Sequence, residues 1–227
     1  MKIFTKAIAA ASLAGAAMVA TPAAAQVTGT IGVVDVPRTV AATTAFSTAY
    51  QQVNTTYASQ ITQIQQKQQQ AQTLLQQLDS NGDGNLDQTE QQAAQNAPQA
   101  QQIQTLEREI GQLQNQVDAS RVYIIEQILQ QYGPALQSVV TADNIQFVLS
   151  PDVVSYAAPA ANIGQKVVAA LNTRVPSVQV TPPQGWQPQQ QSVGVYQQVQ
   201  QLLVFAARQQ AAQQQQAQQP AAQPSGR

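Results

Sequence analysis

The chain has 227 residues, of which 10 are Lys or Arg and 11 are Asp or Glu, and it contains neither His nor Cys. The absence of these two residue types excludes Ser-His-Asp and Cys-His triads, zinc fingers, disulfides, and haem or iron–sulfur sites with their usual ligands. Only 9% of the residues are charged, while about a fifth are Gln, so a basic patch that binds nucleic acid is not expected.

The first 25 residues have the pattern of a secretory signal peptide. Lys2 and Lys6 precede an apolar stretch over residues 7–20, and the small residues 23–25 suit a cleavage site. The alternative is an uncleaved membrane anchor, against which the shortness of the apolar stretch argues. We therefore expect an exported protein whose mature chain begins at Gln26. No later segment is apolar enough for stable membrane insertion.

A strand followed by two long helices is predicted next. The strand covers residues 30–36, which are rich in Ile and Val, and it stops at the proline that follows. The next prolines along the chain are Pro98 and Pro134, and long helices fit the gaps because proline breaks a helix interior. We expect helices over about residues 40–78 and 98–132.

Both predicted helices repeat apolar residues at alternating steps of three and four, which is coiled-coil spacing. Eight of the ten a and d positions of the first helix are apolar. Because such a narrow stripe needs a partner, we predict an antiparallel coiled-coil hairpin over about residues 40–132. Around residues 123–132 the apolar face widens, so that end is expected to lie in a core. The seam positions are Phe46, Tyr50, Val53, Tyr57, Gln60, Ile64, Lys67, Ala71, Leu74 and Leu78, then Ile103, Leu106, Ile110, Leu113, Val117, Ser120 and Ile124.

Between the helices, residues 79–90 read DSNGDGNLDQTE, the twelve-residue pattern of an EF-hand calcium loop. Gly84 permits the sharp turn at the sixth position. We expect weak Ca²⁺ binding, because the loop has no sister loop to pair with. The alternative is an acidic turn that is well solvated and binds nothing specific. The predicted metal ligands are Asp79, Asn81, Asp83, Asn85 through its carbonyl, Asp87 through water, and Glu90.

A small body is predicted after the hairpin. Residues 144–149 and 153–157 read as strands joined by a turn at residues 150–152, and Asn162 can cap a short helix. Three short strands bury too little apolar surface for one subunit. The expected fold class is therefore α+β, with a small β-body formed on oligomerisation.

Residues 176–227 form an extension rich in Pro and Gln. Residues 193–205 are apolar enough for an amphipathic helix, and a disordered segment with an apolar patch is the alternative. We expect the extension to be largely disordered, especially beyond Gln209.

Four segments in this order resemble the Skp/OmpH family of periplasmic chaperones. They are residues 31–38 (IGVVDVPR), which open the hairpin, 145–149 (IQFVL), 154–157 (VSYA) and 163–172 (IGQKVVAALN). The resemblance covers about residues 26–175. It implies a homotrimer in which a small β-body holds three helical hairpins around a cavity. It also implies a periplasmic holdase that keeps unfolded outer-membrane proteins soluble without ATP.

Two features depart from the family pattern. The arms of the family are often basic, whereas these are almost uncharged, so capture of clients is expected to be nearly insensitive to salt. The extension past Pro176 also lies outside the pattern.

Two other classes of protein are alternatives to the chaperone. One is a structural or adhesive stalk, in which calcium stiffens a coiled coil and the Gln-rich tail mediates assembly. The other is a hydrolase with paired carboxylates, for which Glu107, Glu109 and Asp118 are the candidates. Their placement between seam residues is typical of a solvated helix face, so no catalytic residue is predicted.

Overall fold

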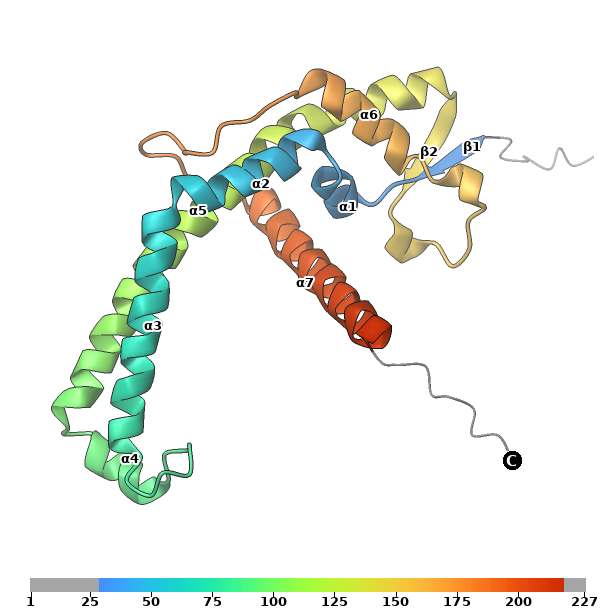
Figure 1. The fold of residues 1–227 in the computed structure, drawn as a ribbon. Coiled ribbons are helices and arrows are strands. Elements are labelled where there is room, and N and C mark those ends of the chain that lie inside the picture. Colours follow the sequence, from blue (N-terminus) through green and yellow to red (C-terminus); the bar gives the residue numbers. More distant parts are fainter. Residues whose placement is uncertain (1–28, 219–227) are drawn as a thin grey trace, which may run out of the picture.

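The computed structural model of the protein describes residues 29–218, and the predicted signal peptide lies outside these residues (Figure 1). The described chain is mostly helical, with one pair of short strands. Its elements are β1 (Thr30–Val33), α1 (Val36–Ala41), α2 (Thr44–Thr56), α3 (Ala58–Leu78), α4 (Gln88–Ala94), α5 (Pro98–Ala142), β2 (Ile145–Leu149), the 3₁₀ turns Pro151–Val153 and Pro159–Ala161, α6 (Gly164–Arg174) and α7 (Gln190–Gln218).

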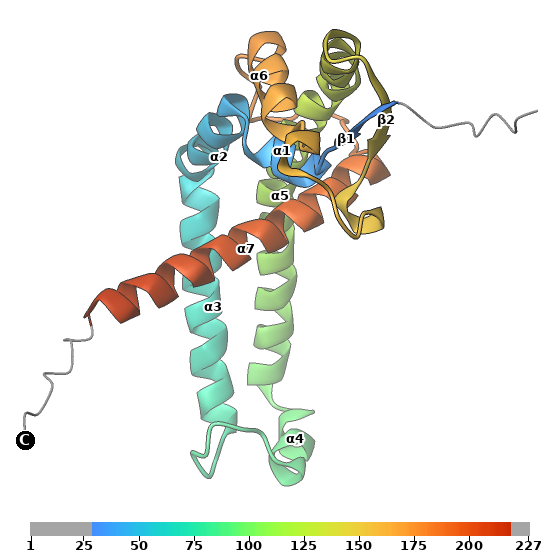
Figure 2. The same ribbon diagram turned by 90° about the vertical axis from the view of Figure 1, so that its right-hand side faces the viewer.

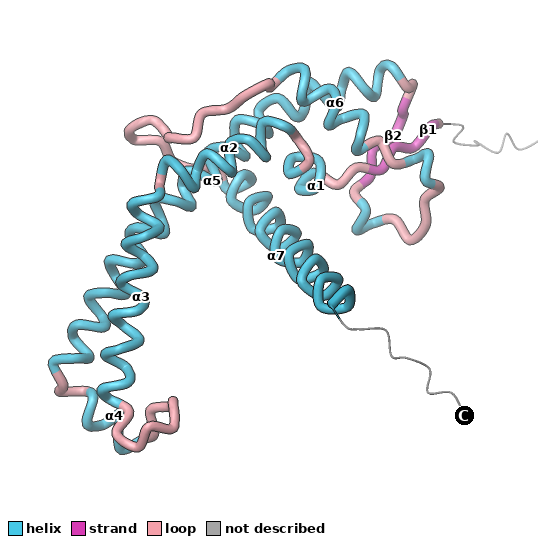
Figure 3. The backbone as a smooth tube through the Cα atoms, viewed as in Figure 1, coloured by secondary structure: helices cyan, strands magenta, loops and turns pink. Residues whose placement is uncertain are grey.

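A body and a long arm make up the molecule (Figures 1 and 2). The arm consists of α3, α4 and the first part of α5, with α3 and α5 antiparallel and side by side. The body contains α1, α2, α6 and the rest of α5, and its strands lie at the end away from the arm (Figure 3). Helix α7 leaves the junction of body and arm and diverges from the arm. The fold class is α+β, as expected.

The strands form a two-stranded parallel sheet in which Gly32 is opposite Val148 and Val33 is opposite Leu149. The predicted strand over residues 153–157 is wrong: Val153 ends a 3₁₀ turn, and the rest of the segment is irregular chain. Val153 and Tyr156 are largely exposed, so no neighbouring strand holds the segment in a ladder.

The first predicted helix is divided into three. Asp35 caps α1 by accepting a hydrogen bond from the Arg38 N–H, which ends the predicted strand early, and Thr43 caps α2 in the same way. The division between α2 and α3 falls at Tyr57, where φ is −107° and ψ is 22°. A heptad pattern does not reveal these divisions, because apolar spacing continues across them.

Helix α5 extends ten residues past the predicted end at Tyr132 and contains Pro134 in its interior. A proline there removes one backbone hydrogen bond, a cost of about 3 kcal/mol in an isolated helix. Ala135 and Val139 lie just beyond it and are buried in the body, so packing offsets this cost. The helix ends before Asn144, whose φ of 51° is the left-handed conformation typical of a helix terminus.

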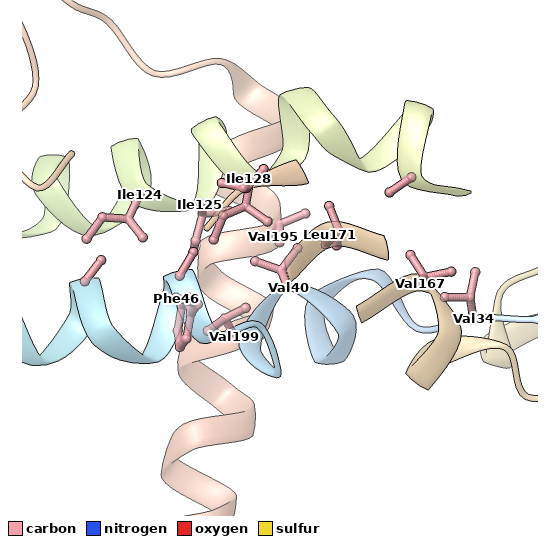
Figure 4. Packing of buried hydrophobic residues seen from close by; sticks show 14 of the residues in the cluster. Val34, Val40, Phe46, Ile124, Ile125, Ile128, Val167, Leu171, Val195 and Val199 are labelled. Atoms are coloured by element: carbon pink, nitrogen blue, oxygen red, sulfur yellow. The ribbon is translucent and has the colours of Figure 1, made fainter. Parts of the chain in front are cut away.

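One hydrophobic core lies where α1, α2, α5, α6 and α7 meet (Figure 4). Ile124, Ile125 and Ile128 are inaccessible to solvent and form its α5 side. They face Val40 and Phe46 from the start of the chain, and α7 contributes its own buried residues. The widened apolar face of α5 therefore lies in a core, as the sequence predicts.

The structure differs from the expected, largely disordered extension. Residues 190–218 form helix α7, and Val195 and Val199 of this helix are buried in the core. The composition is low in complexity, but Gln and Ala are good helix formers, and two buried valines supply the packing that an isolated helix lacks. Among the described residues, no helix is long and apolar enough to cross a membrane.

Candidate functional site: a thin helical arm with an acidic tip

The arm follows the heptad register predicted from the sequence. Every predicted seam position in α2 and α3 is buried or half-buried, including the polar residues Gln60 and Lys67. The predicted seam positions of α5 are likewise buried or half-buried from Ile103 to Ile124. The residues between them are mostly exposed Gln, Ala and Thr, so one side of each helix faces the other helix and the rest faces water.

The outer part of the arm has almost no sealed interior. Helix α3 contains no fully buried residue, and Ile103 is the one buried residue of α5 before Val117. A cleft of about 900 Å³ lies between α3 and α5, with Leu74 and Leu106 in its lining. Its other lining residues are polar or small: Gln66, Gln69, Gln70, Thr73, Pro98, Gln101, Gln102 and Thr105. The arm therefore offers amide groups and half-exposed apolar side chains along the same groove.

Charge plays a small part in this groove. Lys67 is the one charged residue of α3, and its Nζ lies 2.6 Å from a carboxylate oxygen of Glu109 on α5. The pair crosses the seam and fixes the two helices relative to each other, but Glu109 is nearly half exposed, so solvent screens the attraction. The pair also means that Glu109 is a structural partner rather than a free carboxylate.

The tip is closed by Glu90, whose side chain is 7% exposed. Its Oε1 accepts hydrogen bonds from the backbone N–H groups of Ser80 (2.7 Å) and Asn81 (3.1 Å), and its Oε2 accepts one from Asp87 (3.0 Å). Asp87 in turn caps α4 and forms a capping box with Glu90. One carboxylate thus joins the start of the loop to its end.

Two further predicted ligands, Asp79 and Asp83, also accept backbone hydrogen bonds within the loop. Asp79 accepts from Gly82 (2.7 Å) and Gly84 (2.8 Å), and both glycines have positive φ values, of 72° and 84°. Asp83 accepts from Asn85 at 2.8 Å. These bonds turn the loop back on itself as the glycine spacing predicts.

The donor set of the loop suits a hard cation, since all its side-chain ligands are carboxylate or amide oxygens. An oxygen that accepts one N–H bond, as each carboxylate oxygen of Asp79 does, retains a second lone pair, whereas Glu90 Oε1 and Asp87 Oδ1 each already accept two such bonds. The described conformation nevertheless does not gather three acidic side chains into a metal cluster, here or elsewhere in residues 29–218. The carboxylates fit the ion by chemistry and by their order along the chain, and binding would require them to converge.

The carboxylates weighed for hydrolysis do not form a pair. Glu107 is exposed, and Glu109 is held by Lys67. Asp118 lies at the root of the arm, the place where α5 passes from the arm into the body. There it accepts hydrogen bonds from Arg121 (3.1 Å) and from the Tyr196 hydroxyl of α7 (2.7 Å). Burial, together with this bond to Asp118, raises the pKa of Tyr196 to about 12.

Sequence patterns did not reveal the polar contacts at this root. Burial raises the pKa of Tyr50 well above its usual value of 10, and the Tyr50 hydroxyl accepts a hydrogen bond from Gln200 at 3.3 Å. Glu126 is buried on the same stretch of α5. The sequence does contain a signal for Glu126, which is an acidic residue within an otherwise apolar helical face. It contains none that distinguishes Gln200 from the many other glutamines.

Comparison with known proteins agrees with this architecture. A family described as outer membrane protein (OmpH-like) matches residues 30–171, more than half of the chain. The chain belongs to the OmpH-like family. The match spans the body strands, the whole arm and most of α6, and it ends before the C-terminal extension.

A solved structure similar to this OmpH-like chain is that of a Caulobacter crescentus protein described as an OmpH-like outer membrane chaperone. The two chains are 21% identical, the alignment covers 69% of this chain and 91% of the other, and the TM-score is 0.38. No curated protein sequence matches the chain.

Proposed function

We propose that this OmpH-like protein is a periplasmic holdase chaperone, which binds unfolded outer-membrane proteins along its helical arms and keeps them soluble without ATP. The observation that carries the proposal is the incomplete seam of the arm. Helix α3 has no fully buried residue, so Leu74 and its apolar neighbours remain partly available to a client. Membership of the OmpH-like family supports the same function.

Weak and replaceable contacts are what such a function requires. A groove lined by Gln with scattered Leu residues offers adaptable hydrogen bonds and small apolar areas, rather than one deep pocket. Several arms around a shared space add such contacts into useful avidity while each contact still exchanges quickly. Release then needs no energy source, because no single contact is strong.

Self-association is part of the proposal. A two-stranded sheet is marginal alone, and Ile31 and Phe147 of this sheet are 43% and 49% exposed. We propose a homotrimer in which sheets and apolar faces of three bodies complete one another and the hairpins act as coiled-coil arms. Sedimentation equilibrium of the mature chain should give three times the monomer mass, and a monomer at micromolar concentration would contradict the trimer.

Client capture is tested by light scattering after dilution of a urea-unfolded outer-membrane β-barrel protein. The wild-type chain should suppress aggregation equally from low to molar salt, since α3 carries a single charge. Leu74→Gln with Leu106→Gln should weaken suppression because both residues line the arm groove. Leu203→Gln with Val204→Gln, two apolar-to-Gln changes at exposed positions of α7, is the control. A wild-type chain that fails to suppress aggregation would refute the holdase.

We further propose that the tip loop binds one Ca²⁺ weakly through Asp79, Asn81, Asp83, Asn85, Asp87 and Glu90. The ion would supply positive charge among four acidic side chains whose repulsion otherwise opposes a compact loop. Calorimetric titration of the full mature chain with CaCl₂ should give a saturable heat. Asp79→Ala, which removes the carboxylate at the first position of the pattern, should abolish it, while Asp152→Ala in the body should leave it unchanged. Equal heats for all three proteins would show that the tip loop is not a Ca²⁺ site.

A further inference from the structure

The C-terminal extension is bound to α5 by hydrogen bonds that begin soon after α6. The side-chain amide of Gln127 pairs with the backbone of Gln179 in both directions, donating to its carbonyl and accepting from its N–H at 2.9 Å each. Ser120, which is fully buried, donates to the Val180 carbonyl at 2.6 Å. Two side chains of α5 thus bind the backbone of this segment directly.

Glu126 makes the strongest case that α5 is built to receive the extension. Its side chain is 5% exposed, and within the described residues it forms no ion pair. Oε1 accepts from the indole N–H of Trp186 and Oε2 accepts from the backbone N–H of Gln189, both at 3.0 Å. A buried carboxylate without partners is costly, and both of its partners here come from the extension.

Helix α7 begins directly after Gln189 and crosses the root of the arm. Val195 and Val199 enter the core beside Phe46 of α2 and Ile128 of α5 (Figure 4). The Tyr196 hydroxyl donates to Asp118 of α5, and Gln200 donates to the Tyr50 hydroxyl of α2. Helix α7 therefore contacts both α2 and α5 at the base of the hairpin.

The base of the hairpin is also where the arm changes direction. Helices α2 and α3 meet at an angle at the Tyr57 division (Figure 1). The Tyr50 contact to α7 lies two helical turns before this division, on the body side. Among the described residues, α7 makes no hydrogen bond to the arm between the division and the tip, and in Figure 1 it diverges from the arm.

From these contacts we infer that the C-terminal extension is a clasp, formed by residues 176–200, which fixes the angle between body and arm. Trp186 and Gln189 hold it on Glu126, and the first half of α7 packs against α1 and α5 and reaches Tyr50 of α2 through Gln200. The family match ends at residue 171, so the clasp is an addition to the part of the chain that the family shares. The inference concerns arm geometry and does not rest on client capture.

The absence of cysteine allows the clasp to be tested by paired spin labels in the full mature chain. Exposed positions serve as label sites: Gln76→Cys near the tip with Ala169→Cys on α6 reports the arm angle, and Gln209→Cys on α7 with Ala169→Cys reports docking of the extension. Dilution with unlabelled chain restricts each measurement to distances within one subunit. The clasp variant combines Trp186→Phe and Gln189→Pro, which removes both N–H donors to Glu126, and Gln187→Ala is the exposed control.

In the clasp variant α7 should undock, and the arm-angle distance distribution should widen by about twofold or more while the control stays narrow. Undocking without any widening would overturn the inference, because the arm would hold its angle unaided. A docked α7 in the clasp variant would overturn it as well, since the latch would then be dispensable. If that variant loses its far-ultraviolet helical signal, Trp186→Phe alone is measured, and the same two outcomes decide with smaller changes.

Discussion

The tip loop depends on a single carboxylate, and this dependence can be tested without any metal. Removing the Glu90 side chain by Glu90→Ala deprives three backbone N–H groups, those of Ser80, Asn81 and Asp87, of their acceptor. We expect the loop to open locally while the body, far from the tip, keeps its stability. All measurements are made in excess chelator, so the effect concerns the protein alone.

The size of the effect follows from the exposure of the donors. A hydrogen bond to a buried charged group contributes about 1.5–3 kcal/mol, but Ser80, Asn81 and Asp87 are exposed, so water replaces much of each bond. About 0.5–1 kcal/mol for each bond gives roughly 1.5–3 kcal/mol for the loop. Since 1.4 kcal/mol is a factor of ten, amide protection from hydrogen exchange should fall by about 10- to 100-fold.

The graded variant Glu90→Gln sharpens the test, because its amide keeps one acceptor oxygen. If that oxygen takes the place of Oε1, Ser80 and Asn81 stay partly protected, while the Asp87 N–H faces an NH₂ group and loses protection. Asp83→Asn, which preserves an acceptor for Asn85, is the control. Equal exchange rates for these amides in wild type and Glu90→Ala, measured by NMR, would refute the proposed closure of the loop.

Three further predictions concern the body and the arm. Ile128→Ala should lower the free energy of unfolding by about 2–5 kcal/mol in denaturant titrations, because Ile128 is inaccessible to solvent, whereas exposed Gln130→Ala should change little. Since the folded-state pKa of Tyr196 is raised to about 12 from its ordinary 10, its stabilising contribution is complete below pH 10 and is lost as the pH rises towards 12; Tyr196→Phe should therefore make the alkaline decline in stability shallower, and an unchanged slope would contradict this. Lys67→Gln should cost no more than about 1 kcal/mol, and combining it with Glu109→Gln should add almost nothing; a larger coupling in the double-mutant cycle would contradict a screened pair.

The arm was predictable because its pattern is local and periodic. A seam position is determined by spacing along one helix, and the partner helix lies across a short connection. The predicted positions therefore reproduce the burial of the real helices, even at Gln60 and Lys67, where residue type alone argues for exposure. The six ligands of the proposed calcium site follow a pattern of the same local kind, and calcium binding by them stays a prediction.

The body resisted prediction because its contacts join distant parts of the chain. Whether residues 153–157 pair as a strand depends on a free sheet edge, and Val33 instead forms a bridge to Asn162. Helix α5 continues through Pro134 because α6 packs beside it, which no local rule shows. Docking of the extension depends on the buried Val195 and Val199 and on side-chain amide hydrogen bonds. These bonds, such as Gln127 to Gln179 and Gln200 to Tyr50, join residues more than 50 positions apart.

The loose packing of the outer arm and the dense packing at its root are related. If apolar side chains sealed the seam fully, as Ile124 and Ile128 do at the root, none would remain for a client. With α3 free of buried residues, the outer arm cannot hold a defined direction by its own packing. Direction must then be imposed where the helices enter the core, and there α7 adds a third helix to the pair.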